Sequence, residues 1–437
     1  MLAKLVVDWY AFGASAKRPR DNGTKRLRDN ETAGSRSVVS DHVVGSPSST
    51  VRGHVVRSPW PVKSWVCYFT GQLFGGRGHA AVAARSDEIP DGLVQAMPLR
   101  SLWWKWKQRA GHTDSSFYKR ALQADVAFTK AVARLDLPPH DGFFGYSYMS
   151  LEMLEVERAR GAVTVLDQID PGPVEFRLVA EEMARNPGLA GPPLSFPTAY
   201  YDRLKREWEL ADVIVVNSEW SREAIVAEGA DASKIEILPL AFEMEDGRWK
   251  MEERKAPSSD LRSPSTLRVL WLGQVNVRKG IHYLMDAARK LEKENVLFDV
   301  VGSIAVLPAT IASASSNMTF HGPVSRDRAA EWYRQSDVFV LPTLSDGFAL
   351  TQLEALAHGL PVIVTPNCGR IVENGKTGFI VPARDAQALA DAIMRFMHTP
   401  GFAAEMRSHC REAAKLYSVD AYAQRLVEII QKHAGIR

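Results

Sequence analysis

Two acidic residues lie eight positions apart around a short helix in the second half of the chain. The run from Leu341 to Val364 is typical of a buried strand end, a turn at Ser345-Asp346-Gly347, a helix and a second strand. Asp346 falls in the turn, and Glu354 falls at the edge of the apolar side of the helix. Free amides at such a helix start suit a phosphate. The unit could therefore bind a phosphorylated ligand, although the residues alone also allow an ordinary turn and a solvated helix face.

Strands alternate with helices on both sides of a polar segment at 251–265. The helix that carries Glu354 is predicted from about Ala349 to His358, because Gly359 and Pro361 follow it. Such alternation predicts parallel sheets with helices on both faces. The chain has 437 residues, 46% of them hydrophobic, which is enough for two cores. We therefore expect an α/β protein with two Rossmann-like doubly wound domains.

Longer runs around these residues resemble a known family. The acid-x7-acid pattern, followed by EALAHGLPVI, is similar to the Glu-x7-Glu signature of retaining nucleotide-sugar glycosyltransferases of family four (glycosyl transferases group 1). The resemblance spans about 267–417, and ELADVIVVNSEWSREAI extends it back to about His140. It implies the GT-B fold, in which two Rossmann-like domains face a central cleft. Its other matching segments are Trp271–Ala287, Phe320–Val324, Trp332–Thr343 and Pro366–Pro382.

The reaction that the resemblance implies is transfer of a sugar from a nucleotide-diphosphate donor to a hydroxyl of a glycan, lipid-linked or small-molecule acceptor. The departing diphosphate gains negative charge, so cations must lie where that charge grows. Lys279 matches the family lysine that contacts the diphosphate. The family's arginine after the first glycine, Gly273, is Gln274 here, and Arg278 could supply the missing charge.

The resemblance also assigns the two acids. Glu354 matches the acid that holds the ribose hydroxyls, and Asp346 takes the place of the glutamate that contacts donor-sugar hydroxyls. The loop and helix-start amides and the segment that lines the base complete the expected donor site: Gly347, Phe348, Ala349, Leu350, Gly322 and Val324.

The expected donor is a UDP- or GDP-linked sugar, with no cofactor and no metal. The chain contains no Asp-x-Asp motif, which argues against a metal-bridged diphosphate. Positive side chains and amides would suffice. The expectation is thus a metal-independent hexosyltransferase of polysaccharide biosynthesis.

In the first half, Asp167 follows the predicted strand Val163–Leu166, where family members often carry a histidine near the reacting sugar. Asp167 could accept a proton or orient an acceptor hydroxyl, or it could be a turn residue. Retaining transfer in this fold needs no strong base, because the departing phosphate can take the acceptor proton.

The predicted domains are an atypical, partly disordered stretch at 1–60, an acceptor-side domain at 61–250, a linker at 251–265 and a nucleotide-sugar-binding domain at 266–416. Residues 11–60 are polar and locally basic, which suits a solvated insertion or a basic arm. Gly75-Gly76 could be a displaced glycine loop. The terminal helix at 417–437 is expected to cross back to the first domain, or else to cover the second.

Trp103, Trp104 and Trp106 interleave with Lys105, Lys107 and Arg109. This pattern suits a membrane interface, packing inside the first domain, or stacking on acceptor sugars. A net charge of +3 and three widely spaced cysteines argue against nucleic acid as a partner and against a disulfide framework. With no long apolar run, we expect a cytoplasmic protein, with peripheral contact on the inner membrane face as an option.

Two other functions stay open from the sequence. One is a sugar-nucleotide epimerase or phosphorylase of the same fold. The other is a non-catalytic relative that serves as a binding or scaffold subunit, which the unusual segment 11–60 and the substitutions at Gln274 and Asp167 suggest. Retention of Lys279 and Glu354 favours a transferase.

Overall fold

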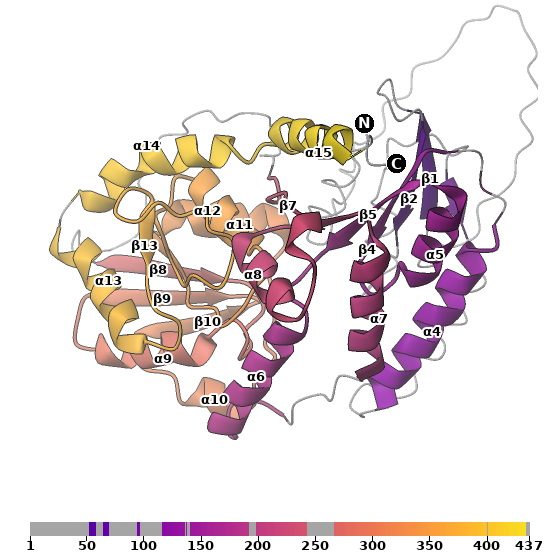
Figure 1. The fold of residues 1–437 in the computed structure, drawn as a ribbon. Helices are drawn as coiled ribbons and strands as arrows, with labels where there is room; N and C mark the ends of the chain where they lie inside the picture. Colours follow the sequence, from indigo (N-terminus) through magenta and orange to yellow (C-terminus); the bar gives the residue numbers. More distant parts are fainter. Residues whose placement is uncertain are drawn as a thin grey trace, which may run out of the picture.

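The computed structural model describes backbone strands at 52–57, 64–69 and 94–96, and residues 116–135, 137, 140–191, 198–242, 266–399 and 401–433. Within these residues the chain forms two mainly parallel sheets, each flanked by helices (Figure 1). The predicted α/β fold with two doubly wound domains is confirmed.

The first sheet has the strand order β3-β1-β2-β4-β5-β6-β7. β1 pairs antiparallel with β2 and β3, whereas the other neighbours pair in parallel. All residues of β4, β5 and β6 are buried, as in a parallel sheet that helices cover. The strands are β1 (Arg52–Arg57), β2 (Ser64–Phe69), β3 (Val94–Ala96), β4 (Gly142–Tyr146), β5 (Val163–Gln168), β6 (Val213–Val216) and β7 (Ile235–Ile237). The helices are α4 (Ser116–Val132), α5 (Leu151–Arg160), α6 (Pro173–Arg185), α7 (Thr198–Leu210) and α8 (Glu219–Ala227).

The second sheet is entirely parallel, with the order β10-β9-β8-β11-β12-β13. Its strands are β8 (Leu267–Leu272), β9 (Val296–Val301), β10 (Met318–Gly322), β11 (Val338–Leu341), β12 (Val362–Val364) and β13 (Gly378–Ile380). The helices are α9 (Ile281–Lys290), α10 (Pro308–Ala312), α11 (Arg326–Gln335), α12 (Leu350–Ala357), α13 (Ala386–His398) and α14 (Phe402–Lys415). One continuous hydrophobic core joins these elements.

The first sheet begins inside the segment 1–60, for which the composition indicates disorder. β1 pairs with β2 along its whole length, from Arg52 opposite Phe69 to Arg57 opposite Ser64. Backbone hydrogen bonds to the next strand along the chain create this order, and the side-chain composition of 1–60 carries no information about them. The predicted strand at 5–10, the glycine pair at 75–76, the tryptophan segment at 101–109 and the linker at 251–265 lie outside the described residues.

The terminal helix α15 (Val419–His433) packs on the first domain. Leu426 and Ile430 belong to one hydrophobic cluster with Val165 of β5. At its end, His433 Nε2 lies 2.8 Å from Glu236 Oε1 of β7. Figure 1 shows α14 along the second domain and α15 continuing toward the strands of the first.

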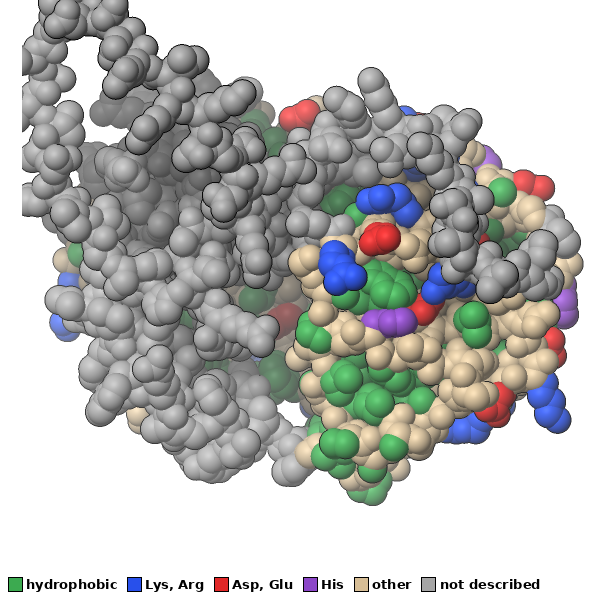
Figure 2. Space-filling view, turned by 180° about the vertical axis from the view of Figure 1, so that it is seen from behind, with side chains coloured by type: hydrophobic (Ala, Val, Ile, Leu, Met, Phe, Trp, Pro, Cys, Tyr) green, Lys and Arg blue, Asp and Glu red, His purple; other side chains and the backbone are tan. Residues whose placement is uncertain are grey.

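The reverse side of the second domain carries a hydrophobic patch that Lys or Arg, Asp or Glu, and His side chains surround (Figure 2). Both signs of charge occur there, so this face is not a continuous basic surface. In the part of the chain that the structure describes, no helix combines the length and apolar character needed to span a membrane.

Candidate functional site

The loop between β11 and α12 folds around the carboxylate of Asp346. Asp346 Oδ1 accepts hydrogen bonds from the amides of Phe348, at 3.2 Å, and Ala349, at 2.8 Å. Ala349 has a left-handed backbone, with φ at 63°, and half-buried Leu350 begins the helix. The sequence assigns these amides to a phosphate, but in this structure Asp346 occupies two of them, because the turn brings its side chain under its own helix start.

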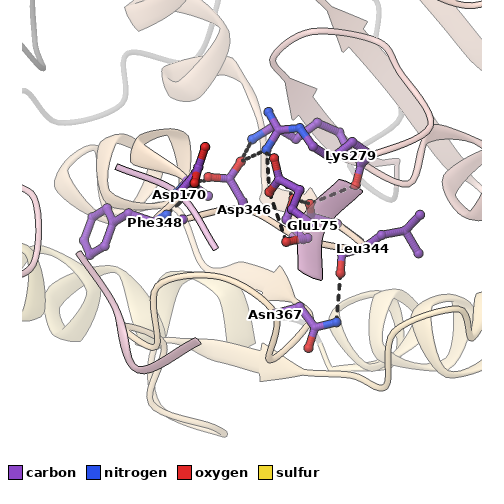
Figure 3. Close-up of polar contacts among 12 residues, drawn as sticks. Asp170, Glu175, Lys279, Leu344, Asp346, Phe348 and Asn367 are labelled. Atoms are coloured by element: carbon purple, nitrogen blue, oxygen red, sulfur yellow. Dashed lines mark hydrogen bonds and ion pairs between the residues drawn. The ribbon is translucent and has the colours of Figure 1, made fainter. Parts of the chain in front are cut away.

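The backbone of the same loop is held in place by hydrogen bonds to its neighbours (Figure 3). The amide of Leu344 donates to the carbonyl of Arg278 at 2.8 Å, and Asn367 Nδ2 donates to the carbonyl of Leu344 at 2.8 Å. Gly280 approaches so closely that a Cβ there would lie 1.8 Å from the carbonyl oxygen of Pro342. The segment after β8 and the segment after β11 therefore form one rigid unit.

Two cations from the segment after β8 converge on this unit. Lys279 Nζ contacts Asp346 Oδ2, and Arg278 NH1 lies 3.3 Å from the same oxygen and 3.2 Å from the carbonyl of Ser345. Burial, with the like charge of Arg278, lowers the pKa of Lys279 to about 7. The contact with Asp346 favours the charged form of the lysine, as any anion bound there would.

The glycine and glutamine that precede the cations shape their loop. Gly273 continues from β8 and donates its amide to Val301 at 3.0 Å. Gln274 is exposed, and its Oε1 accepts from Asn276 Nδ2 at 2.9 Å. Asn276 Oδ1 in turn accepts from the amide of Lys279 at 2.9 Å. Gln274 thus supports the loop that positions the lysine.

Asp170, on the first-domain side, is a carboxylate that the sequence analysis missed. Its Oδ1 accepts three hydrogen bonds: from Tyr148 Oη at 2.9 Å, from the amide of Gly172 at 2.9 Å, and from Gln168 Nε2 at 3.0 Å. Burial raises the pKa of Asp170, and these donors oppose the shift. The signal that could have found it is the turn Asp-Pro-Gly-Pro directly after a buried strand.

Glu175 is the second missed carboxylate, and it reaches the second domain. Its Oε2 accepts from Ser345 Oγ at 3.0 Å and lies 3.4 Å from Arg278 NH1. Burial raises the pKa of Glu175; Arg278 opposes this, and Asp170 adds to it. Because Pro173 begins α6, Glu175 falls in the first helical turn, and Figure 3 shows it beside Lys279 and Asp346 of the second domain.

The two domains touch directly at Gly347. A Cβ at this glycine would lie 2.8 Å from Asn217 Nδ2 and 2.9 Å from the carbonyl oxygen of Ile169. Ser218 Oγ donates to the carbonyl of Gly347. Only a residue without a side chain fits between the loop after β5 and the start of α8.

Asp167 lies on β5 and is not among the residues that meet the second domain in the contacts above. Its side chain is buried, and its charge adds to the burial that raises the pKa of Tyr422 on α15. The structure therefore places Asp167 near the terminal helix. The carboxylate that the end of β5 presents to the charge of Arg278 is Asp170.

The expected ribose and base positions lie on the second domain. Half-buried Glu354 accepts a hydrogen bond from Tyr333 Oη at 2.8 Å, and Tyr333 stacks on His358 with ring centroids 5.0 Å apart. Gly322 ends β10 with φ at 70°, and Val324 packs partly against the second core. Their assignment to ribose and base stays a prediction. Among the described residues, no group of three or more His, Cys, Asp and Glu side chains could hold a metal ion.

Comparisons with known proteins agree with this arrangement. Residues 266–399 match the family model of glycosyl transferases group 1. The D-inositol 3-phosphate glycosyltransferase of Xylanimonas cellulosilytica is 25% identical over 236 residues, which cover 50% of this chain and 56% of that protein. The chain spans about half the length of the curated relatives it matches.

Two solved structures share the fold. The sucrose-phosphate synthase of Thermosynechococcus elongatus aligns with a TM-score of 0.55 and 21% identity, over 74% of this chain and 79% of its own. Anabaena Alr3699/HepE in complex with UDP aligns with a TM-score of 0.53 and 16% identity, over 71% and 82%. At these identities the likeness establishes the fold, and it confirms the predicted GT-B architecture.

Proposed function

From the match of residues 266–399 to the family model of glycosyl transferases group 1, we propose that the protein transfers a sugar from a nucleotide-diphosphate donor to a hydroxyl group. The observation that carries the proposal is the convergence of Arg278 and Lys279 on the start of α12, at the contact between the two domains.

In the proposed reaction the bond between the anomeric carbon and the diphosphate oxygen breaks, and its electron pair leaves with the diphosphate. Arg278 and Lys279 stabilise that charge. Asp346 and Glu175 are the partners of these cations in the structure. A diphosphate carries more negative charge than either carboxylate, so it would compete for both cations.

We further propose a retaining course. The acceptor oxygen then bonds to the anomeric carbon on the face that the diphosphate leaves, and its proton passes to the departing phosphate oxygen. This course needs no strong base beside the sugar. Once the diphosphate of the bound donor has replaced Asp346 as the partner of the cations, Asp346 would be free to bind hydroxyls of the donor sugar.

The donor is proposed to be a UDP- or GDP-hexose, bound without a metal ion. Glu354 would accept hydrogen bonds from the ribose, and the backbone at Gly322 and Val324 would line the base. Support for a uridine nucleotide comes from the fold of Anabaena Alr3699/HepE, whose structure contains UDP. A glycan or lipid-linked acceptor at the cytoplasmic membrane face fits a role in polysaccharide biosynthesis.

The test is a panel of UDP-glucose, UDP-N-acetylglucosamine, GDP-mannose and ADP-glucose. Binding is measured by thermal shift, and release of nucleoside diphosphate is measured with and without sugar acceptors. We expect one donor to raise the melting temperature and to release nucleotide faster when an acceptor is present. Binding without release under any condition would favour a non-catalytic subunit, and a change of the sugar without release would favour an epimerase.

A further inference from the structure

Among the described residues, the donors that orient the carboxylate of Asp170 contact one of its two oxygens. The three donors from Tyr148, Gly172 and Gln168 all contact Oδ1. A carboxylate fixed through one oxygen has a defined direction for the other, which still has lone pairs to accept hydrogen bonds.

The position of Asp170 relative to the second domain is set by its neighbour. The carbonyl of Ile169 lies against Gly347, one residue beyond Asp346. The charge of Arg278 acts on Asp170, and Asp170 acts on Glu175. Asp170 therefore belongs to the first-domain wall of the cleft, and Figure 3 shows it beside Asp346 of the second domain.

The two carboxylates of this first-domain wall, Asp170 and Glu175, restrict what it can bind. Asp170 and Glu175 are both carboxylates in a setting where burial raises their pKa values, so a second anion beside them is unfavourable. A neutral hydroxyl can donate to a carboxylate and relieve part of its desolvation. A phosphate cannot donate in its ionised form.

We propose that Asp170 binds the acceptor, by accepting a hydrogen bond from a hydroxyl next to the one that reacts. The reacting end of the acceptor is then a vicinal diol without a phosphate, as on a sugar ring or a cyclitol. This inference rests on the proposed glycosyl transfer. The reacting hydroxyl still gives its proton to the departing phosphate oxygen, and Asp170 gains no proton.

The test uses the full chain with Asp170→Asn, which keeps the oxygen that the three donors contact. Three probes serve as acceptors for the donor that the panel identifies: water, myo-inositol and D-inositol 3-phosphate. Water has no neighbouring hydroxyl for Asp170 to bind, so slow donor hydrolysis serves as the internal control. We expect the myo-inositol-dependent release of nucleotide to fall about 10- to 100-fold and the release to water to stay unchanged. The donor KM and the thermal shift by the nucleotide should stay unchanged.

The matched control is Asp212→Asn. Asp212 is a carboxylate of the same domain that accepts from Thr164 at 2.9 Å, at the other end of β5. It should leave the myo-inositol-dependent release unchanged. Wild-type protein should release nucleotide faster with myo-inositol than with its 3-phosphate, and Asp170→Asn should reduce this preference for the neutral probe.

Three outcomes would overturn the inference. One is nucleotide release by Asp170→Asn with myo-inositol at the wild-type rate. The second is loss of nucleotide binding together with turnover, since that would make Asp170 a structural residue. The third is a wild-type preference for D-inositol 3-phosphate. If the wild-type protein releases no nucleotide from any donor, the proposed function itself fails, and the acceptor site fails with it.

Discussion

Glu175 and Glu182 lie seven residues apart on α6, and both reach from the first domain to the second, but their surroundings differ. Glu175 meets Ser345 and Arg278 in the cleft. Glu182 meets donors from α9 and from the loop before α13. Because seven residues make two helical turns, one face of one helix carries both contacts.

Glu182 is fully provided with hydrogen-bond donors. His282 Nε2 lies 3.0 Å from its Oε1, Tyr283 Oη donates to the same oxygen at 2.6 Å, and Arg384 Nε donates to Oε2 at 2.8 Å. Asn186 Nδ2 adds a fourth contact from its own helix at 2.9 Å. Burial would raise the pKa of Glu182, but these donors outweigh it and the pKa is lowered. We call this group of residues the latch.

Glu175 has the opposite balance. Burial outweighs its contacts with Arg278 and Ser345, and its pKa is raised. A carboxylate that its surroundings do not fully compensate is costly to keep in a fold, and such groups concentrate at functional sites. Glu182 thus makes a contact that holds the domains together, whereas Glu175 lies where a ligand could supply the hydrogen bonds that its carboxylate still lacks.

The largest expected effect is on the cleft side. Lys279→Ala removes a cation from the proposed diphosphate site and should lower kcat/KM by about 10²- to 10³-fold, roughly 3 to 4 kcal/mol of transition-state stabilisation. Arg384→Ala on the latch serves as the control and should lower kcat/KM by less than about tenfold, because it touches domain contact only. Steady-state nucleotide release measures both. An unchanged kcat/KM in Lys279→Ala would contradict the diphosphate site.

The next effect concerns Glu354, whose contact with Tyr333 could be structural or could orient it for a ligand. If it binds ribose, Glu354→Gln should weaken donor binding by about 1 to 3 kcal/mol, because a charged hydrogen bond is lost. The melting temperature without nucleotide should change little. Titration calorimetry with the nucleoside diphosphate measures the first and thermal unfolding the second. Normal affinity with a large loss of stability would place Glu354 with the latch rather than with the cleft.

Isosteric substitutions on α6 should then shift stability in opposite directions. At pH 7.5, Glu182→Gln should lower the melting temperature by about 2 to 6 °C, because charged hydrogen bonds are lost. Glu175→Gln should raise it slightly, because a carboxylate with a raised pKa costs stability when it is ionised. Thermal unfolding of the three proteins in one buffer is the measurement, and shifts of the same sign would remove the distinction.

The pH dependence of these melting-temperature shifts follows from the directions in which the pKa values of Glu182 and Glu175 are shifted. The folded-state pKa of Glu182 is lowered, so its stabilisation is complete above the ordinary pKa of 4.5 and disappears as the pH falls through the lowered value. The folded-state pKa of Glu175 is raised, so its cost is present at neutral pH and disappears as the pH falls toward 4.5. The gain from Glu175→Gln should therefore shrink as the pH falls from the raised pKa toward 4.5, whereas the loss from Glu182→Gln should persist over that range.

The second domain could be predicted closely from the sequence because its signals are local. The helix with Glu354 was expected at about Ala349–His358 and runs from Leu350 to Ala357. The cleft partners could not be predicted in the same way. Glu175 and Glu182 acquire their roles only when α6 meets residues about 100 to 200 positions away, and single-sequence patterns do not register such pairs. Asp167 was predicted as the residue that follows a strand, but strand β5 continues through Gln168. Asp170, in the loop after β5, is the carboxylate that lies near the second domain.

The smallest expected effect separates backbone strain in the cleft from strain in the latch. Ala349 and Arg384 both have left-handed backbones, with φ at 63° and 66°. Glycine relieves such strain, about 1 to 2 kcal/mol, but loses roughly 0.4 to 1 kcal/mol through greater freedom of the unfolded chain. Ala349→Gly should therefore raise the melting temperature by at most about 3 °C. Arg384→Gly relieves the same strain but removes the guanidinium that donates to Glu182, so it should lower the melting temperature. Equal shifts in thermal unfolding would mean that the Arg384 side chain adds nothing to the latch, and that backbone geometry alone sets the stability at both positions.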